Sequence, residues 1–149
     1  MIGNVVDARQ AYNASRLRTH ENVLSYDGSS RDVFLINSVV YKVVQSDWDY
    51  DFNTAEYEAI ATNSHEFPAN VRYPQVSIFN VNGKFPVIAM EYIEGEAIAE
   101  CTCHPDDGEC MTDCMTIEEY TLIEPFMSDP SGFNVIRCED GMYVIIDAA

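Results

Sequence analysis

Two oxygen-bearing side chains in the last part of the chain, Asn134 and Asp147, could share a divalent cation. They flank two short apolar runs that meet at the turn Glu139-Asp140-Gly141. Because the two ends of a β-hairpin lie side by side, both side chains are expected on adjacent strand ends. Carboxylate and amide oxygens are ligands that Mg²⁺ takes in proteins. The two side chains are therefore both able to hold a metal at this hairpin.

A lysine, Lys42, lies within the apolar run Val39–Val44. An unpaired charge facing the core of a protein is costly, so this ammonium group either faces solvent at a sheet edge or has a carboxylate partner. The helix expected after this strand offers Glu56 and Glu58. We favour Glu56 as the partner that orients Lys42, although an acid near the start of a helix is also common without such a role.

Four of the five cysteines are concentrated in one short segment that also contains a histidine. The soft ligands of this segment are Cys101, Cys103, His104, Cys110 and Cys114. Zn²⁺ takes four sulfur or nitrogen ligands, and such a site can fold an irregular segment. The spacing differs from that of a standard zinc finger. Zinc binding, a disulfide pair in an oxidising compartment and free thiols therefore all stay open.

Hydrophobic periodicity and turn residues predict the elements that position these groups. The predicted helices cover residues 4–19, a segment capped by Asn53 or Thr54 with Glu56 in its first turn, and residues 116–127. The predicted strands cover residues 23–26, 32–36, 39–44, 76–79, 85–92, 133–136 and 142–146. Asn82-Gly83 is a strong signal for a two-residue hairpin turn. The first three strands are expected to form an antiparallel meander.

This element order, the apolar segment Val87–Glu96 and the spacing from Asp129 to Asn134 resemble the protein-kinase-like superfamily, especially its small phage and bacterial members. The resemblance runs from about Asn22 onward. It implies an α+β fold with a kinase-like antiparallel N-lobe sheet and one helix, plus a truncated C-terminal part with a helix and a catalytic-loop hairpin. We expect a single domain over residues 1–149, whose parts are an N-terminal helix at 1–21, the N-lobe-like part at 22–95 and the reduced C-lobe-like part at 96–149.

The resemblance also implies a nucleotide site. Gly28, Ser29 and Ser30, in the first hairpin, would cover phosphates with backbone amides, although an ordinary hairpin turn explains them as well. Glu91 and Ile93 would offer a backbone carbonyl and a backbone amide to an adenine edge. A buried strand that ends in a turn is the alternative reading of this second segment.

The catalytic roles follow from the same resemblance. Lys42, oriented by Glu56, would hold the first phosphates, and Asp129 would accept the proton of the attacking hydroxyl or orient it. Asn134 and Asp147 would hold the metal, so the implied cofactors are ATP and Mg²⁺, with Zn²⁺ open. The sequence departs from the family pattern at three points. Met127-Ser128 precede Asp129 where kinases usually have a histidine, Ser131 stands two residues after Asp129 where protein kinases commonly have lysine, and Asp147 is followed by two alanines. These departures leave catalysis open.

Charge and hydropathy exclude several classes of protein. The 149 residues include 25 acids and 8 lysines or arginines, a net charge of −17, which repels nucleic-acid phosphates. This charge serves either solubility or binding to a basic protein surface. A hydrophobic content of 47% argues against disorder. No apolar run approaches the roughly 18 residues of a membrane span, and the N-terminus lacks an apolar signal core. We expect a cytoplasmic location, in the host cytoplasm for a phage protein, without a membrane partner.

Three functional hypotheses follow. The first is an ATP- and Mg²⁺-dependent phosphotransferase that resembles a minimal Ser/Thr protein kinase and acts on a host protein. The second is a catalytically degenerate kinase-like acidic protein that binds and inhibits a basic or nucleic-acid-binding host protein. The third is a small-molecule kinase acting on a substrate such as an aminoglycoside or choline, which shares the Asp-to-Asn spacing. The sequence leaves the oligomeric state open.

Overall fold

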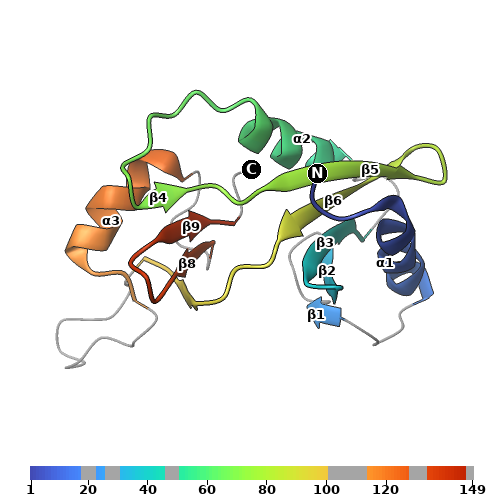
Figure 1. Ribbon diagram of the computed structural model, residues 1–149, viewed down its shortest axis with the longest axis horizontal. Helices are drawn as coiled ribbons and strands as arrows, with labels where there is room; N and C mark the ends of the chain where they lie inside the picture. Colours follow the sequence, from blue (N-terminus) through green and yellow to red (C-terminus); the bar gives the residue numbers. More distant parts are fainter. Residues whose placement is uncertain (18–22, 26–30, 46–50, 101–113, 128–133, 147–149) are drawn as a thin grey trace. The chain divides into compact units, whose positions relative to one another are not determined.

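The computed structural model describes residues 1–17, 23–25, 31–45, 51–100, 114–127 and 134–146 (Figure 1). These residues separate into two compact units. The first unit consists of the described residues of Met1–Asn63 and Gln75–Tyr92, and the second of Ser64–Pro74 together with the described residues after Tyr92. Both contain helices and β-sheet, so the predicted α+β class is confirmed. Residues 64–74, which we expected within the N-lobe-like part, belong to the second unit.

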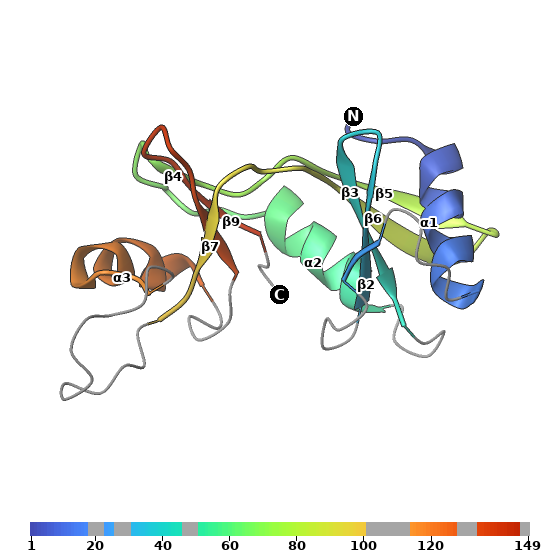
Figure 2. The same cartoon turned by 90° about the horizontal axis from the view of Figure 1, so that it is seen from below.

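The first unit is built on a five-stranded antiparallel sheet. Its strands, in spatial order, are β1 (Val23–Ser25), β2 (Arg31–Ile36), β3 (Val39–Val44), β6 (Phe85–Glu91) and β5 (Val76–Val81). Two helices, α1 (Val5–Leu17) and α2 (Asp51–Ala61), lie on opposite faces of this sheet (Figure 2). The meander of the first three strands and the helix after them match the sequence prediction.

Alternation along β2 decides which side chains face which helix. Phe34 and Ile36 are buried and pack in one hydrophobic cluster with Ala8 and Ala11 of α1. The intervening positions of β2 point to the other face, because successive side chains of a strand alternate. This second face is the one that α2 covers, and it carries Lys42 of β3.

The hairpin between β5 and β6 turns at the predicted Asn82-Gly83, but its connection has three residues, 82–84, where two were expected. Asn82 and Gly83 both adopt left-handed backbone conformations, with φ of 54° and 84°. Two such residues in a row make a type I′ turn, whose twist matches that of the flanking strands. β6 is buried at all five interior positions, as predicted for a strand covered on both faces.

The second unit contains a four-stranded sheet and the helix α3 (Ile117–Ile123). The strands, in spatial order, are β4 (Val71–Arg72), β9 (Tyr143–Ile145), β8 (Val135–Arg137) and β7 (Glu96–Ile98). β4 runs parallel to β9, and the other pairs are antiparallel. The core of the unit consists of Val71, Ile98, Met115, Ile123, Val135 and Ile145.

Two predicted helix boundaries are wrong. The helix expected over residues 116–127 ends at Ile123 and continues only as the 3₁₀ helix η2 (Glu124–Phe126), because Pro125 lacks the backbone N–H that an α-helix needs. α2 begins at Asp51, so neither Asn53 nor Thr54 caps it, and Glu56 lies beyond its first turn. Two strands were not predicted: β4, which has only two residues, and β7, which has three.

None of the helices in the described ranges is both long and apolar enough to cross a lipid bilayer.

Candidate functional site

Lys42 and Glu56 form a buried ion pair in the first unit. Lys42 lies in the middle of the sheet, where it pairs with Val33 of β2 and Ile88 of β6. Its Nζ lies 2.8 Å from Oε1 of Glu56 on α2. Glu56 is 0% exposed and Lys42 is 8% exposed. A lysine among valines thus has the carboxylate partner that its burial requires.

A second cation, Arg31, binds the other oxygen of the same carboxylate. Nη1 of Arg31 donates to Oε2 of Glu56, and it also donates to Oδ1 of Asn53 at 3.3 Å. The sequence analysis missed Arg31 as a member of this site. Period-two alternation could have found it, because Arg31 and Val33 share a face of β2 and Val33 pairs with Lys42.

Asn53 connects α2 to the sheet. Its Nδ2 donates to the backbone carbonyls of Lys42, at 2.8 Å, and of Pro86, at 2.9 Å, and the residue is 0% exposed. It therefore supplies hydrogen bonds to two neighbouring strands instead of capping the helix. Because Asn53 and Glu56 are one helical turn apart, both face the sheet and hold the site from the same side.

The described part of this site is suited to binding an anion. One buried carboxylate holds an ammonium and a guanidinium group, which are the two side-chain cations that bind phosphate oxygens by charge-assisted hydrogen bonds. A low-dielectric setting strengthens such contacts. The arrangement can thus fix two cationic heads at one point of a rigid sheet.

The segment predicted to contact adenine joins the two units. Met90 is buried, and the backbone N–H of Glu91 donates to the carbonyl of Gln75 at 3.0 Å. The side chain of Glu91 accepts from the backbone N–H of Gln75 at 2.8 Å. Ile93 is half-buried. The adenine-binding role of Glu91 and Ile93 stays a prediction.

Gly95 follows this segment and packs against β8. Its φ is 157°, and a Cβ placed there would lie 2.5 Å from the carbonyl oxygen of Arg137 and 2.6 Å from Cγ2 of Ile136. Any side chain would force the backbone of β7 away from β8. Glycine at this position therefore permits the β7–β8 pairing.

Asn134, one of the two predicted metal ligands, lies at the open end of the β8–β9 hairpin. Val135 pairs with Ile145, and one step further the N–H of Ile146 donates to the carbonyl of Asn134 at 2.8 Å. Asn134 therefore lies beside Ile146, the residue immediately before Asp147 in the sequence. Five predicted site residues lie outside the described residues: Gly28, Ser29, Ser30, Asp129 and Asp147.

Most of the cysteine-rich segment also lies outside the described residues, namely Cys101, Cys103, His104 and Cys110. Cys114 is described, forms a β-bridge with Ala99, and is half-buried. Within the described ranges no three His, Cys, Asp or Glu side chains gather as a metal site would require. Zinc binding by this segment stays a prediction.

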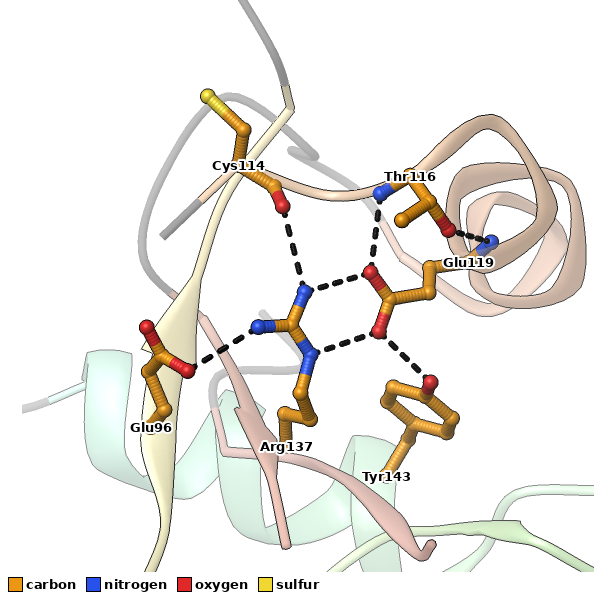
Figure 3. Close-up of polar contacts among 6 residues, drawn as sticks. All are labelled: Glu96, Cys114, Thr116, Glu119, Arg137 and Tyr143. Atoms are coloured by element: carbon orange, nitrogen blue, oxygen red, sulfur yellow. Dashed lines mark hydrogen bonds and ion pairs between the residues drawn. The ribbon is translucent and has the colours of Figure 1, made fainter. Parts of the chain in front are cut away.

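A second polar network surrounds Arg137 in the second unit (Figure 3). Its guanidinium donates twice to Glu119, from Nε to Oε2 at 2.7 Å and from Nη2 to Oε1 at 2.6 Å. It also donates to Glu96 at 3.1 Å and to the carbonyl of Cys114 at 3.2 Å. The hydroxyl of Tyr143 donates to Glu119 at 2.6 Å. Arg137, on β8, is thus hydrogen-bonded to α3 through Glu119, to β7 through Glu96 and to the backbone of Cys114.

Glu119 also completes a capping box. Its Oε1 accepts from the backbone N–H of Thr116 at 2.9 Å, and the Thr116 hydroxyl accepts from the backbone N–H of Glu119 at 3.1 Å. The hydrogen bond from Arg137 is the main cause that lowers the pKa of Glu119 to about 2. Burial raises the pKa of the Tyr143 hydroxyl, and its bond to Glu119 raises it further. The ionised form of Glu119 is therefore strongly favoured in the folded state.

This pKa predicts an acid-sensitive contribution to stability. The pKa of Glu119 is about 2 in the folded protein, against 4.5 for an unperturbed glutamate, so the unfolded state binds more protons at intermediate pH. The contribution is complete above about pH 4.5 and is lost as the pH falls towards 2, by up to roughly 3 kcal/mol. Urea unfolding between pH 2 and 6 should show that loss in the wild type but not in Glu119→Gln. Glu118→Gln, at the exposed neighbouring position, should behave like the wild type, and parallel curves for Glu119→Gln and wild type would contradict the prediction.

Comparison with known proteins gives a distant match among solved structures. No protein-family model and no curated protein matches the chain. Among solved structures, the chain is similar to one described as the streptomycin–ATP–APH(2")-IIa ternary complex, with 20% sequence identity and a TM-score of 0.37. The match covers 66% of this chain and 32% of that chain, so the chain spans about a third of that structure's length. We base the functional proposal on the contacts around Lys42 and Glu56.

Proposed function

We propose that the chain is a kinase-like phosphotransferase in which Lys42, oriented by Glu56, binds the phosphates of ATP. The observation that supports the proposal is the ion pair of 2.8 Å between a β3 lysine and a fully buried α2 glutamate. Burial fixes the position of the ammonium group and reduces the side-chain freedom that phosphate binding would otherwise cost. Phosphoryl transfer relies mainly on such positioning and on electrostatic stabilisation of charged oxygens.

The sheet face around Lys42 supports binding of a base as well. Val33 and Leu35 alternate with the residues that face α1, and both are only half-buried. Val33 is the direct neighbour of Lys42 across β2 and β3. An apolar surface next to a fixed cation is the combination that a nucleotide needs, since its base is flat and apolar and its phosphates are charged.

The remaining roles are proposed from the sequence. Asp129 would accept or orient the proton of the attacking hydroxyl, and Glu91 and Ile93 would bind the adenine edge through the backbone. Asn134 and Asp147 offer an amide oxygen and a carboxylate, a donor set that fits Mg²⁺. Mg²⁺, when bound, would neutralise charge on the phosphates. A hydroxyl of a host protein is the substrate that the proposal favours.

Titration with Mg-ATP in a calorimeter tests the proposal. Lys42→Met should weaken ATP binding by about ten- to a hundredfold, because a hydrogen bond to a charged group contributes about 1.5–3 kcal/mol. The chain has only two lysines, and the other, Lys84, is exposed after the Asn82-Gly83 turn. Lys84→Met therefore removes the same charge and should bind like the wild type. Absence of binding by the wild type at millimolar Mg-ATP would contradict the proposal, as would equal affinity of Lys42→Met.

The net charge of −17 favours a second candidate function, that of an acidic protein that binds a basic host protein without catalysis. The two functions differ in their dependence on Lys42. A basic partner captured equally by the wild type and by Lys42→Met, and released at high salt, would support the second function. Loss of partner modification in Lys42→Met, when radiolabelled ATP is supplied, would support the first.

A further inference from the structure

We propose that Arg31 is a second phosphate-binding residue, which together with Lys42 gives the site a preference for a polyphosphate. This inference rests on the proposed nucleotide-binding function and adds to it the part of the ligand that the site recognises. In the sequence, Arg31 follows the segment Gly28-Ser29-Ser30, whose backbone amides are predicted to cover phosphates. A guanidinium group would supply charge as well as donors at that end of the site.

The shared carboxylate brings the two cations together. Oε1 of Glu56 accepts from Lys42, and Oε2 accepts from Arg31. The two oxygens belong to one carboxylate, so the two cationic heads are held within a few ångströms of each other. The register of β2 and β3 is consistent with this proximity. Arg31 pairs with Val44, which is two residues from Lys42 and on the same face of the sheet.

Burial shows which charges an approaching anion would meet. The side chain of Glu56 is 0% exposed, whereas the side chains of Arg31 and Lys42 are 12% and 10% exposed. The carboxylate therefore lies beneath the two cations, and only the cations reach the surface. The partly exposed side chains of this trio are therefore the two positive ones, although the whole chain has a net charge of −17.

The chemistry of the two heads favours adjacent phosphate groups. An ammonium group is a compact point charge, and a guanidinium is a planar fork whose nitrogens can bind a carboxylate on one side and phosphate oxygens on another. Two such heads side by side match a ligand with charged oxygens on neighbouring phosphorus atoms. We therefore expect inorganic tripolyphosphate to bind even without an attached nucleoside. The affinity for adenosine should not depend on Arg31.

Calorimetric titration of Arg31 variants with Mg-ATP, tripolyphosphate and adenosine tests this inference. Arg31→Ala should weaken binding of ATP and tripolyphosphate by about ten- to a hundredfold. Arg31→Lys should lose less of this affinity, because lysine keeps the positive charge. Adenosine binding should not change in either variant. Arg9→Ala is the matched control, because Arg9 is an exposed arginine of α1 in the same unit and its loss changes the net charge equally.

The outcomes separate this inference from the proposed function. Wild-type affinity of Arg31→Ala for ATP would overturn the role of Arg31 and leave nucleotide binding intact. Equal weakening for adenosine would also overturn it, since that result indicates a structural role. Tripolyphosphate binding without ATP binding would remove the proposed function while supporting the anion site, and binding of neither would overturn both. If Arg31→Ala does not fold, Arg31→Lys provides the test. A lower ratio of ATP affinity to adenosine affinity than in the wild type supports the role of Arg31, and an unchanged ratio overturns it.

Discussion

Replacement of Glu56 with glutamine is expected to lower the free energy of unfolding by about 3–5 kcal/mol, because it removes a fully buried carboxylate that pairs with the buried Lys42 and the half-buried Arg31. Glutamine has nearly the same shape as glutamate, so the change isolates the charge. It also places an amide group where Lys42 and Arg31 each donate a hydrogen bond. Urea unfolding monitored by circular dichroism measures the effect.

Glu58 provides the matched control for this prediction. It lies on the same helix, is exposed, and differs from Glu56 only in its surroundings. Glu58→Gln should change the free energy of unfolding by less than about 0.5 kcal/mol. A loss of similar size in both variants would show that Glu56 acts through helix electrostatics, and the account of the buried site would then be wrong.

Replacement of Arg137 with methionine is expected to lower the stability of the second unit by about 3 kcal/mol. Methionine keeps much of the volume but removes the two hydrogen bonds to Glu119, which is itself only 8% exposed. The carboxylate would then keep its bonds from Thr116 and Tyr143 but lose its countercharge. Breaking a buried pair by removing one partner costs more than the pair contributes.

Hydrogen exchange followed by mass spectrometry can locate this effect. Arg137→Met should speed exchange in peptides from β7, β8 and β9 and leave those from β2, β3 and β6 unchanged. Arg72→Met, which alters an arginine of β4 in the same unit, should have a much smaller effect. Uniformly faster exchange in both units would contradict the assignment of the Arg137 network to the second unit alone.

The order of elements in the first unit could be predicted because its local signals agree with its tertiary structure. The Asn82-Gly83 turn, the apolar run of β6 and the alternation of β2 each indicate the same sheet. The pairing of Lys42 with Glu56 followed from one physical requirement, since a lysine inside an apolar strand needs a carboxylate and the next helix offered two candidates. Burial distinguishes them, because Glu56 is enclosed and Glu58 is exposed.

The errors arose where a local rule competes with long-range contacts. Asparagine is a favoured helix cap, so Asn53 was expected at the start of α2, yet its amide binds the carbonyls of Lys42 and Pro86 on two strands. Glu119 is a second example, because sequence patterns predict no partner for it. Its main partner, Arg137, lies on a different element, and sequence periodicity does not reveal such a pairing.

Local sequence patterns predicted part of the candidate site and missed another part. The position of Asn134 beside Ile146 follows from the hairpin pattern, which is local. Arg31 was missed because it follows turn residues and was considered with them, whereas its strand alternation places it with Lys42. The roles of Asp129 and Asp147 stay predictions from the sequence.

Labelling with an acyl phosphate of ATP tests the central claim, that Lys42 binds nucleotide phosphates, most directly. The amine of a lysine next to the terminal phosphate attacks the acyl carbonyl, an amide forms on that lysine, and ATP leaves. The chain offers only Lys42 and Lys84, so mass spectrometry of the digest assigns the label without ambiguity. The account predicts labelling of Lys42 that excess ATP suppresses, with little on Lys84. Label on exposed Lys84 alone, or label on Lys42 that ATP does not reduce, would contradict it.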